Sequence, residues 1–213
     1  GEGRDKAAIK FRLLALCAGA DRGAAAGAEK RREILNEVVA LEALGTILDF
    51  PACIDGAWTL AYSSALSRGS GSGGGASKNS PRMFQTPDRA GSLNFGPRAQ
   101  VGEVVQRISS RKGTLDNIVS VNLPFLGTAV LTLKHKLEVS TGMKNEVSIY
   151  LTGIEAKNPG SFLTQKLGLR PLEIPVITQV SRQGKGVFET TFVDENVRVS
   201  RGDRGELRVF VKA

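Results

Sequence analysis

The sequence predicts a mainly β protein in which an αα-hairpin precedes an antiparallel up-and-down β-barrel. Helical periodicity is confined to the first fifty residues. From residue 56 onward the pattern changes to short runs with a period of two, which is typical of strands. Roughly eight to ten such runs follow one another without helices long enough for parallel crossovers. A meander of about eight strands closes most easily into a barrel that can hold one small ligand.

The helical hairpin is predicted within residues 1–50. Residues 5–20 carry apolar side chains at the spacing of one helix face, and residues 28–44 repeat the pattern. Gly23 between them can adopt the left-handed conformation that ends a helix. The resulting apolar side can pack on the sheet, plug a barrel end, or dock a partner protein or a lipid surface. Its members are Ile9, Leu13, Leu16, Ile34, Val38 and Leu41.

The barrel is expected to span residues 56–213 and to begin with GAWTLAYSS. Alternation places Trp58, Leu60 and Tyr62 on one face of this first strand. A Gly/Ser-rich stretch at about residues 67–81 then predicts a flexible surface loop, because it has little to bury. Its glycines do not indicate a phosphate-binding loop, since GK[ST] and a following helix pattern are both missing.

Four further strands are predicted in the middle of the chain. The clearest run, residues 128–139, places five apolar residues on the same face as His135, the only histidine. A lone histidine there is either a core residue bonded to a neighbour or a polar point in a pocket. The longer connection at residues 156–175 holds an amphipathic turn that could pack as a loop, act as a lid or touch a membrane. The other three runs are residues 100–110, 115–123 and 146–152.

The end of the chain is predicted to close the barrel. After a run at residues 172–181, three more alternate with a period of two, so each should have one buried and one wetter face. Gly202 and Gly205 bracket a polar turn that can join the last two runs as a hairpin. The tripeptide Arg201-Gly202-Asp203 is explained by this turn rather than by an adhesion function. The three final runs are residues 187–193, 196–201 and 206–211.

The charge distribution favours an anionic partner. The net charge is +8 with a pI near 9.8, which suits a lipid surface, a nucleic acid or an acidic protein face. No apolar run approaches the roughly eighteen residues that a spanning helix needs. Residues 51–114 hold eight basic side chains against three acidic ones. We expect six of the basic residues to face a membrane surface, namely Arg82, Arg89, Arg98, Arg107, Arg111 and Lys112.

The sequence offers no recognisable enzyme site. GxSxG, HExxH and a second histidine for a metal pair are all missing. The carboxylates of residues 194–203 alternate across strand faces, so they are not expected to share an acid/base pocket. Cys17 and Cys53 lack metal-site spacing and are either reduced thiols or a single regulatory disulfide. We therefore expect no catalysis, no metal and no required cofactor.

Several motifs together resemble the plastid lipid-associated protein family, also called fibrillins. They are LLALCAGADRGAAAG and EILNEVVALEAL in the helices, GAWTLAYSS, VGEVVQRI and DNIVSVNLP in the barrel, and the ending TTFVDENVRVSRGDRGELRVFVK. The resemblance implies a lipocalin-like barrel and plastid localisation at plastoglobules or thylakoids. It also implies binding of lipids such as carotenoids, prenylquinones or fatty acids.

Gly56 and Trp58 match the GxW motif of lipocalin-like barrels, in which an arginine near the chain end lies over the indole. The resemblance makes Arg198 and Arg201 the candidates for that role, where a cation–π contact contributes on the order of 1–2 kcal/mol. Asp194 is expected to fix the backbone beside a turn. The arginines are thus interpreted as closure residues rather than as an anion site.

Two functions are carried forward from the sequence. In the first, the barrel binds a prenyl lipid, carotenoid or acyl chain at an anionic plastid membrane. In the second, the barrel is filled by large side chains such as Phe125, Phe188 and Phe192, and docks on a thylakoid complex or a prenylquinone-pathway enzyme. Nucleic-acid binding is not expected, because no aromatic platform accompanies the basic residues. The lipid-lining candidates are Val119, Val121, Leu131, Leu133, His135, Val147 and Ile149.

Overall fold

The computed structural model describes residues 2–45, 47, 49–66, 100–123, 127–140, 145–157, 173–177 and 185–213. Two helices, α1 (Glu2–Ala18) and α2 (Ala28–Leu44), precede the strands, as the sequence predicts. Two 3-10 turns flank the first strand, η1 (Ala52–Ile54) and η2 (Ser64–Leu66). The strands are β1 (Gly56–Ser63), β2 (Gln100–Ser109), β3 (Thr114–Leu123), β4 (Gly127–Val139), β5 (Glu146–Lys157), β6 (Glu173–Ile177), β7 (Lys185–Val193), β8 (Val197–Gly202) and β9 (Leu207–Lys212). The predicted loop at residues 67–81 lies outside the described residues, and the proposed division at residues 50–56 stays a prediction.

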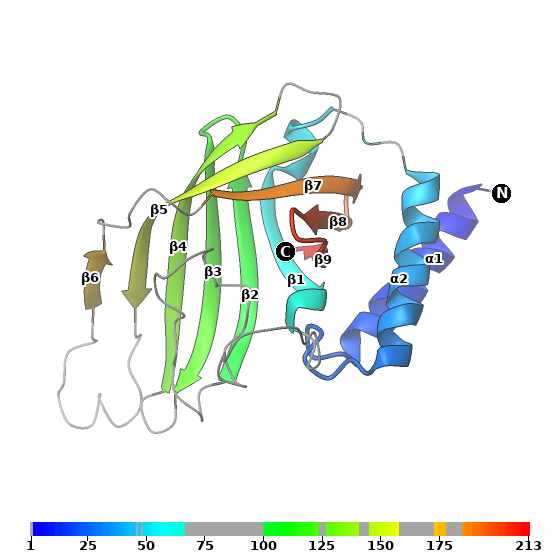
Figure 1. The fold of residues 1–213 in the computed structure, drawn as a ribbon, viewed down its shortest axis with the longest axis horizontal. Coiled ribbons are helices and arrows are strands. Elements are labelled where there is room, and N and C mark those ends of the chain that lie inside the picture. The colour runs from blue at the N-terminus through cyan, green and yellow to red at the C-terminus, as the bar shows by residue number, and fades with distance from the viewer. Residues whose placement is uncertain are drawn as a thin grey trace.

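The strands form a closed antiparallel ring. From β1 to β5 and from β7 to β9, each strand pairs with the next along the chain. Strand β5 also pairs with β7, and β9 pairs with β1, which closes the ring. Short β6 adds to the same edge of β5, beyond the segment paired with β7. The up-and-down, lipocalin-like barrel predicted from the sequence is therefore confirmed (Figure 1). Strand β5 extends to Lys157 rather than ending at the predicted residue 152.

The ring is complete over only part of the long strands. Strand β4 has thirteen residues, whereas β8 and β9 have six each. Strand β1 pairs with β2 only at residues 56–59 and 105–108, and β7 pairs with β5 only at residues 185–189 and 146–150. Beyond these pairs, β2 to β5 continue as a sheet, which gives the barrel a tall side and a short side (Figure 1).

Two hydrophobic clusters lie on opposite faces of the short side. One fills the interior and includes Trp58, Leu60 and Phe210. The other joins α1 and α2 to the outer faces of β8 and β9, where Val197 and Val199 contact the hairpin. Both faces of β8 are consequently buried, and the predicted wetter face is wrong for this strand. Arg198 and Ser200 occupy the face that points into the barrel.

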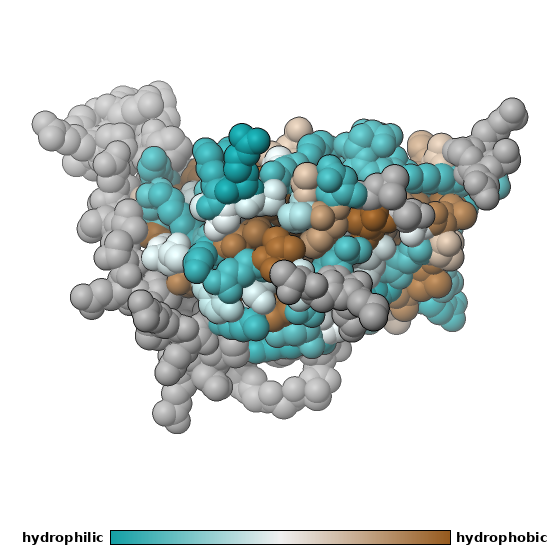
Figure 2. Space-filling model, turned by 90° about the horizontal axis from the view of Figure 1, so that it is seen from above, coloured by the Kyte–Doolittle hydropathy of each residue, from teal (hydrophilic) through white to brown (hydrophobic). Residues whose placement is uncertain are grey.

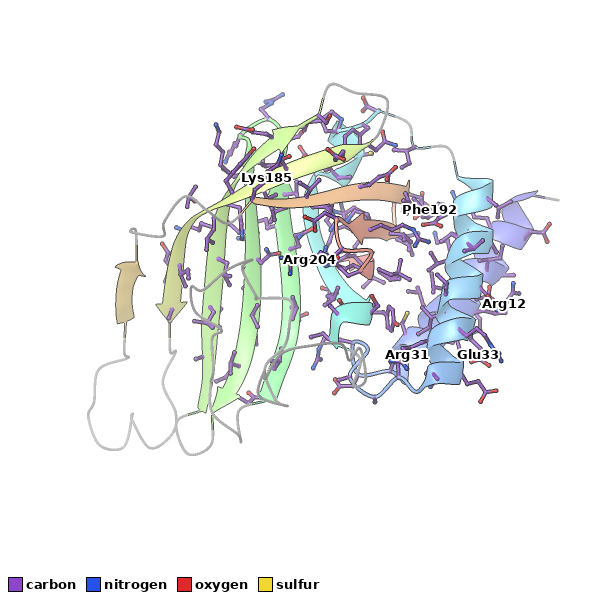
Figure 3. The ribbon with its side chains drawn as sticks, viewed as in Figure 1. Arg12, Arg31, Glu33, Lys185, Phe192 and Arg204 are labelled. Atoms are coloured by element: carbon purple, nitrogen blue, oxygen red, sulfur yellow. The ribbon has the colours of Figure 1, made fainter. Side chains whose placement is uncertain are left out.

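Irregular pairing changes the face of some residues. A register shift between Leu60 and Tyr62 moves Tyr62 into the cluster under the helices, although alternation placed it with Trp58. A similar shift between Thr190 and Phe192 turns Phe192 outward, while Phe188 stays inside. Figure 3 shows Phe192 at the end of β7 next to α2. The second of the two functions needs Phe192 inside the barrel, and this residue instead packs in the cluster under the hairpin.

Ion pairs to Asp194 and to Glu42 hold the hairpin on the barrel. Lys10 Nζ in α1 lies 2.7 Å from an oxygen of Asp194, in the turn between β7 and β8. Arg201 of β8 donates from Nε and Nη2 to the two carboxylate oxygens of Glu42 in α2, at 2.9 and 2.8 Å. The hairpin therefore packs on the side of the barrel, which is one of the alternatives that the sequence left open.

Part of the hairpin surface remains apolar. Four large hydrophobic side chains on the helices are exposed, namely Phe11, Leu35, Val39 and Leu44. Viewed from above, hydrophobic side chains reach the surface among hydrophilic ones (Figure 2). Within the described part of the chain, neither helix has the length and apolar character needed to cross a membrane.

Candidate functional site in the barrel interior

The tall side of the barrel carries an apolar wall on its inner face. We use this term for the buried residues Val104, Val119, Val121, Leu131, Leu133 and Val147 of strands β2 to β5. Strand pairing places Val119 opposite Leu131 and Val121 opposite Ala129. Ile149 is partly buried against the same cluster. The structure thus brings the predicted lipid-lining aliphatic residues onto one inner surface.

His135 lies on this surface between Leu133 and Leu137. Its Nδ1 is 3.2 Å from the backbone oxygen of Leu115 on the neighbouring strand. Burial lowers the pKa of His135, outweighing the opposite effect of backbone hydrogen bonds. The ring is therefore neutral at physiological pH and contributes a polar point without charge. No group of three or more potential metal ligands occurs among the described residues.

Trp58 lies at one end of the ring, beneath the turn η1. Its Nε1 donates a hydrogen bond of 2.8 Å to the backbone oxygen of Ile54. Lys212 Nζ lies 4.2 Å from the ring centroid and donates to Asp55 O at 2.6 Å. Gly56 has φ of +114°, a conformation that residues with a side chain rarely adopt. These contacts place the GxW residues at a closed end of the barrel.

Arg198 is the side chain that lies over the indole. Its Cζ is 5.3 Å from the Trp58 ring, 4.3 Å from Phe210 and 5.9 Å from Phe188. Its Nη2 donates to Gln106 Oε1, and Gln106 in turn donates to Asn117 Oδ1 at 3.0 Å. Arg201, the second candidate, points outward to Glu42 and makes no such contact.

Arg198 is fully buried, yet no described carboxylate lies within ion-pair distance of it. Its Nε and Nη1 have no hydrogen-bond partner in the described part of the chain. Burial, followed by repulsion from Arg208, lowers the pKa of Arg198 to about 9. The guanidinium is still charged at neutral pH, so it lies against an aromatic surface as a cation that no described residue compensates.

A row of polar side chains lies beside Arg198 on the short side of the barrel. Strand pairing aligns Thr190 with Ser200, Ser200 with Arg208, and Arg208 with Ser63, which we call the polar row. The hydroxyl oxygens of Ser63 and Thr190 are buried and have no described partner. Arg208 donates to Glu206 at 2.7 Å. The interior thus has an apolar tall side and a polar, cationic short side.

The sequence contained a signal for this polar surface. Arg198 and Ser200 share one strand face by alternation, as do Arg208 and Phe210. Alternation with Val197 and Val199 predicts that this face is the wetter one. The helices cover the valines, and Arg198, Ser200 and Phe210 are buried inside the barrel.

The other predicted site residues lie in a turn, on the surface, or outside the described residues. Asp194 Oδ1 accepts hydrogen bonds from the backbone of Asn196 at 2.9 Å and of Val197 at 2.8 Å, as a turn residue does. Arg107, Arg111 and Lys112 are exposed on β2 and the turn that follows it. The structure does not describe Arg82, Arg89, Arg98 or Phe125.

Both cysteines are free thiols. Cys17 is buried between the helices and the barrel, and burial raises its pKa to about 12. Cys53 packs in η1 against the interior cluster, where burial also raises its pKa. The two residues belong to different clusters, and neither has the lowered pKa of a reactive thiol.

Comparisons with known proteins cover almost the entire chain. The profile of the PAP_fibrillin family matches residues 7–211. The chain is 34% identical to Plastid-lipid-associated protein 6, chloroplastic, of Arabidopsis thaliana, over 97% of this chain and 70% of that protein. It is 26% identical to Plastid lipid-associated protein 2, chloroplastic, of Brassica campestris, over 96% of this chain and 68% of the relative. It is also 26% identical to Light-induced protein, chloroplastic, of Solanum tuberosum, over 96% of this chain and 67% of that protein. No solved structure gives a significant match.

Proposed function

Because the chain belongs to the PAP_fibrillin family, whose named relatives are chloroplast proteins associated with plastid lipids, we propose that it is a non-catalytic lipid-binding protein of plastids. It holds a prenyl lipid, a carotenoid or an acyl chain inside the barrel, at a thylakoid membrane or a plastoglobule. The bound lipid is the cargo, and no cofactor is required.

The apolar wall is the observation that carries this proposal. Val119, Val121 and Leu131 lie side by side on the inner face of the tall side, where the ring of strands is incomplete. A chain placed along them gains about 0.8 kcal/mol for each methylene removed from water. The hydrophobic gain depends on the apolar area that is buried and not on specific contact geometry. The wall therefore accepts acyl and prenyl chains alike.

A direct test identifies what the native protein carries. The protein purified from chloroplasts is extracted with organic solvent, and the extract is analysed by mass spectrometry. We expect a prenyl or acyl lipid in near-stoichiometric amount. An extract without such a lipid, together with failure of the delipidated protein to bind the neutral probe nile red, would contradict the proposal.

A matched pair of variants locates the binding surface. Leu131→Trp enlarges an inner-face residue, while Thr132→Trp adds the same side chain on the opposite face of β4. We expect Leu131→Trp to weaken nile red binding at least about tenfold, since an indole occupies the space of the chain. Thr132→Trp should leave binding unchanged. Equal binding by both variants would place the lipid outside the barrel.

Membrane contact is assigned to the exposed basic residues. Arg107, Arg111 and Lys112 each contribute about 1 kcal/mol near an anionic surface, and salt screens this attraction. The triple glutamine variant is therefore expected to float less with vesicles that contain phosphatidylglycerol. Flotation that is equal for both proteins and independent of salt would remove these residues from the contact.

A second candidate function, docking on a plastid protein, rests on the hairpin surface. Phe11 is 76% exposed and Val39 is 53% exposed, which is unusual for large apolar side chains on paired helices. Crosslinking in isolated plastid membranes would give one stoichiometric partner that is lost in Phe11→Gln, Val39→Gln protein. Crosslinks only to lipid or to many proteins would argue against this candidate.

A further inference from the structure

Arg198 is charged and buried, and no counter-ion lies beside it among the described residues. Its guanidinium is fully inaccessible to solvent, and its Nε and Nη1 lack acceptors in the described part of the chain. Burying a cation is unfavourable unless hydrogen bonds and an opposite charge replace water. The aromatic rings of Trp58 and Phe210 attract the cation, but they do not replace the oxygen acceptors that its N–H groups would have in water.

The neighbouring groups do not supply the missing anion. Gln106 accepts one hydrogen bond from Nη2 and is neutral. The carboxylate of Glu206, directly before β9, accepts a hydrogen bond from Arg208 at 2.7 Å. Lys212 adds further positive charge at the closed end. The hydroxyls of Ser63 and Thr190, in the polar row, are buried and lack described partners as well.

From these contacts we infer that Arg198 and the polar row form the headgroup site for a lipid that bears a carboxylate. A carboxylate oxygen accepts from the unpaired N–H groups of Arg198 and supplies the charge that the site lacks. The inference rests on the proposed lipid-binding function and adds that acidic lipids are preferred over neutral ones. Arg198 thus combines contact with the indole and recognition of the headgroup.

The geometry also sets the direction of the bound lipid. On neighbouring strands, Gln106 lies opposite Trp58 on one side and opposite Asn117 on the other. Because Arg198 donates to Gln106, its guanidinium lies at the level of these three residues. Val119 and Val121 follow Asn117 on the same face of β3, farther from the closed end. A headgroup at Arg198 therefore leaves the chain running along the apolar wall toward the tall side.

Comparison of an acid with its alcohol tests the inference. Oleic acid and oleyl alcohol have the same chain, and each is used to displace nile red from the delipidated protein. We expect the acid to displace the probe at about tenfold lower concentration or less, because a charge-assisted hydrogen bond forms only with the acid. Arg198→Gln should bring the two concentrations together by weakening the acid alone. Lys136→Gln, which removes an exposed charge on the outer face of β4, should keep the preference.

The outcomes separate the headgroup site from the general function. If both lipids displace the probe equally from the natural protein, or Arg198→Gln keeps the acid preference, the inference is overturned and lipid binding stands. If neither lipid nor nile red binds, the proposed function itself fails. If acetate binds as well as oleic acid, the site takes free anions and the inference as stated is wrong.

A pH series on the natural protein supports the test should Arg198→Gln fail to fold. The preference for the acid is expected to disappear as pH falls below the pKa of the lipid carboxyl, about 5, since a protonated headgroup no longer neutralises the guanidinium. An acid preference that persists unchanged at low pH, where the protein remains folded by circular dichroism, would contradict the inference.

Discussion

Gly23 lies where the chain turns from α1 back toward the barrel. Its φ is +106°, and a Cβ atom at this position would lie 2.2 Å from the backbone oxygen of Ser63. The preceding residue, Arg22, accepts a hydrogen bond of 2.9 Å from Ser63 N and donates one of 2.6 Å to Val101 O. The turn is thus pressed against the ends of two strands. The sequence predicts a glycine here because of the left-handed conformation, and the close approach to Ser63 is a second reason why a side chain does not fit.

Gly23→Ala is expected to lower the free energy of unfolding by about 2 kcal/mol, because both the positive φ and the contact with Ser63 O must be relieved. Gly27→Ala is the matched control. Gly27 precedes α2 with φ of −68°, and its added Cβ would meet nothing within 4 Å. Urea unfolding followed by circular dichroism should give a loss of about 0.5 kcal/mol for the control. Equal losses would show that the approach to Ser63 does not constrain this turn.

Each helix of the hairpin forms an ion pair with the barrel, α1 through Lys10 to Asp194 and α2 through Glu42 to Arg201. Burial alone would raise the pKa of Asp194, but hydrogen bonds from Lys10 and from the backbone of Asn196 and Val197 outweigh it and lower the pKa. The pKa of Glu42 is likewise lowered, since its hydrogen bonds with Arg201 overcome the effect of burial. Both carboxylates therefore stabilise the folded state in their charged form.

Asp194→Asn should lower the free energy of unfolding by about 1.5 kcal/mol at pH 7, since Asn keeps the oxygen acceptor of the turn but loses the charge opposite Lys10. A lowered pKa in the folded state gives stability that is complete above about pH 5 and is lost as the pH falls through the folded-state value. The difference between the two proteins is thus expected to shrink from pH 7 to about pH 3.

Urea unfolding across this pH range measures the difference. Glu138→Gln serves as the control, because Glu138 pairs with Lys136 on the exposed face of β4 and should contribute no measurable stability. A difference between natural protein and Asp194→Asn that stays constant with pH would show that the Asp194 charge does not hold the hairpin.

Strand and helix positions were predictable from the sequence, whereas the inner face of each strand was not. Period two identifies which residues of β8 share a face, but it gives no information on which face points inward when both are buried. Burial of Val197 and Val199 under the hairpin depends on contacts with helices more than 150 residues earlier in the chain. Register shifts, such as the one before Tyr62, have no signal in the hydrophobic pattern.

The candidate site was predictable in part for the same reason. Aliphatic alternation on β3 and β4 identified most of the apolar wall, since one face of these strands is clearly more apolar. The polar row and the unpaired state of Arg198 come from four strands that meet only when the ring closes. The GxW resemblance identified Trp58 and left two candidates, Arg198 and Arg201, for the arginine over the indole. Arg201 points outward to Glu42, so Arg198 is the one that contacts Trp58.

At the scale of the whole molecule, the barrel combines a short side and a tall side with different inner surfaces. The short side, braced from outside by the hairpin, presents Arg198 and the polar row. The tall side presents the apolar wall beyond the limits of the closed ring. This arrangement suits an amphipathic ligand with its polar end near Trp58 and its apolar chain along β3 and β4.

The central claim is that a lipid chain occupies the barrel interior, and Trp58 reports on it directly. Trp58 is the only tryptophan of the chain and is fully buried in the interior cluster. Its fluorescence is measured during titration with fatty acids that carry bromine near the carboxylate or in the middle of the chain, with the unbrominated acid as control. The account predicts saturable quenching, strongest for bromine near the carboxylate. Binding of the brominated acids, measured by equilibrium dialysis, without quenching of Trp58 would contradict it.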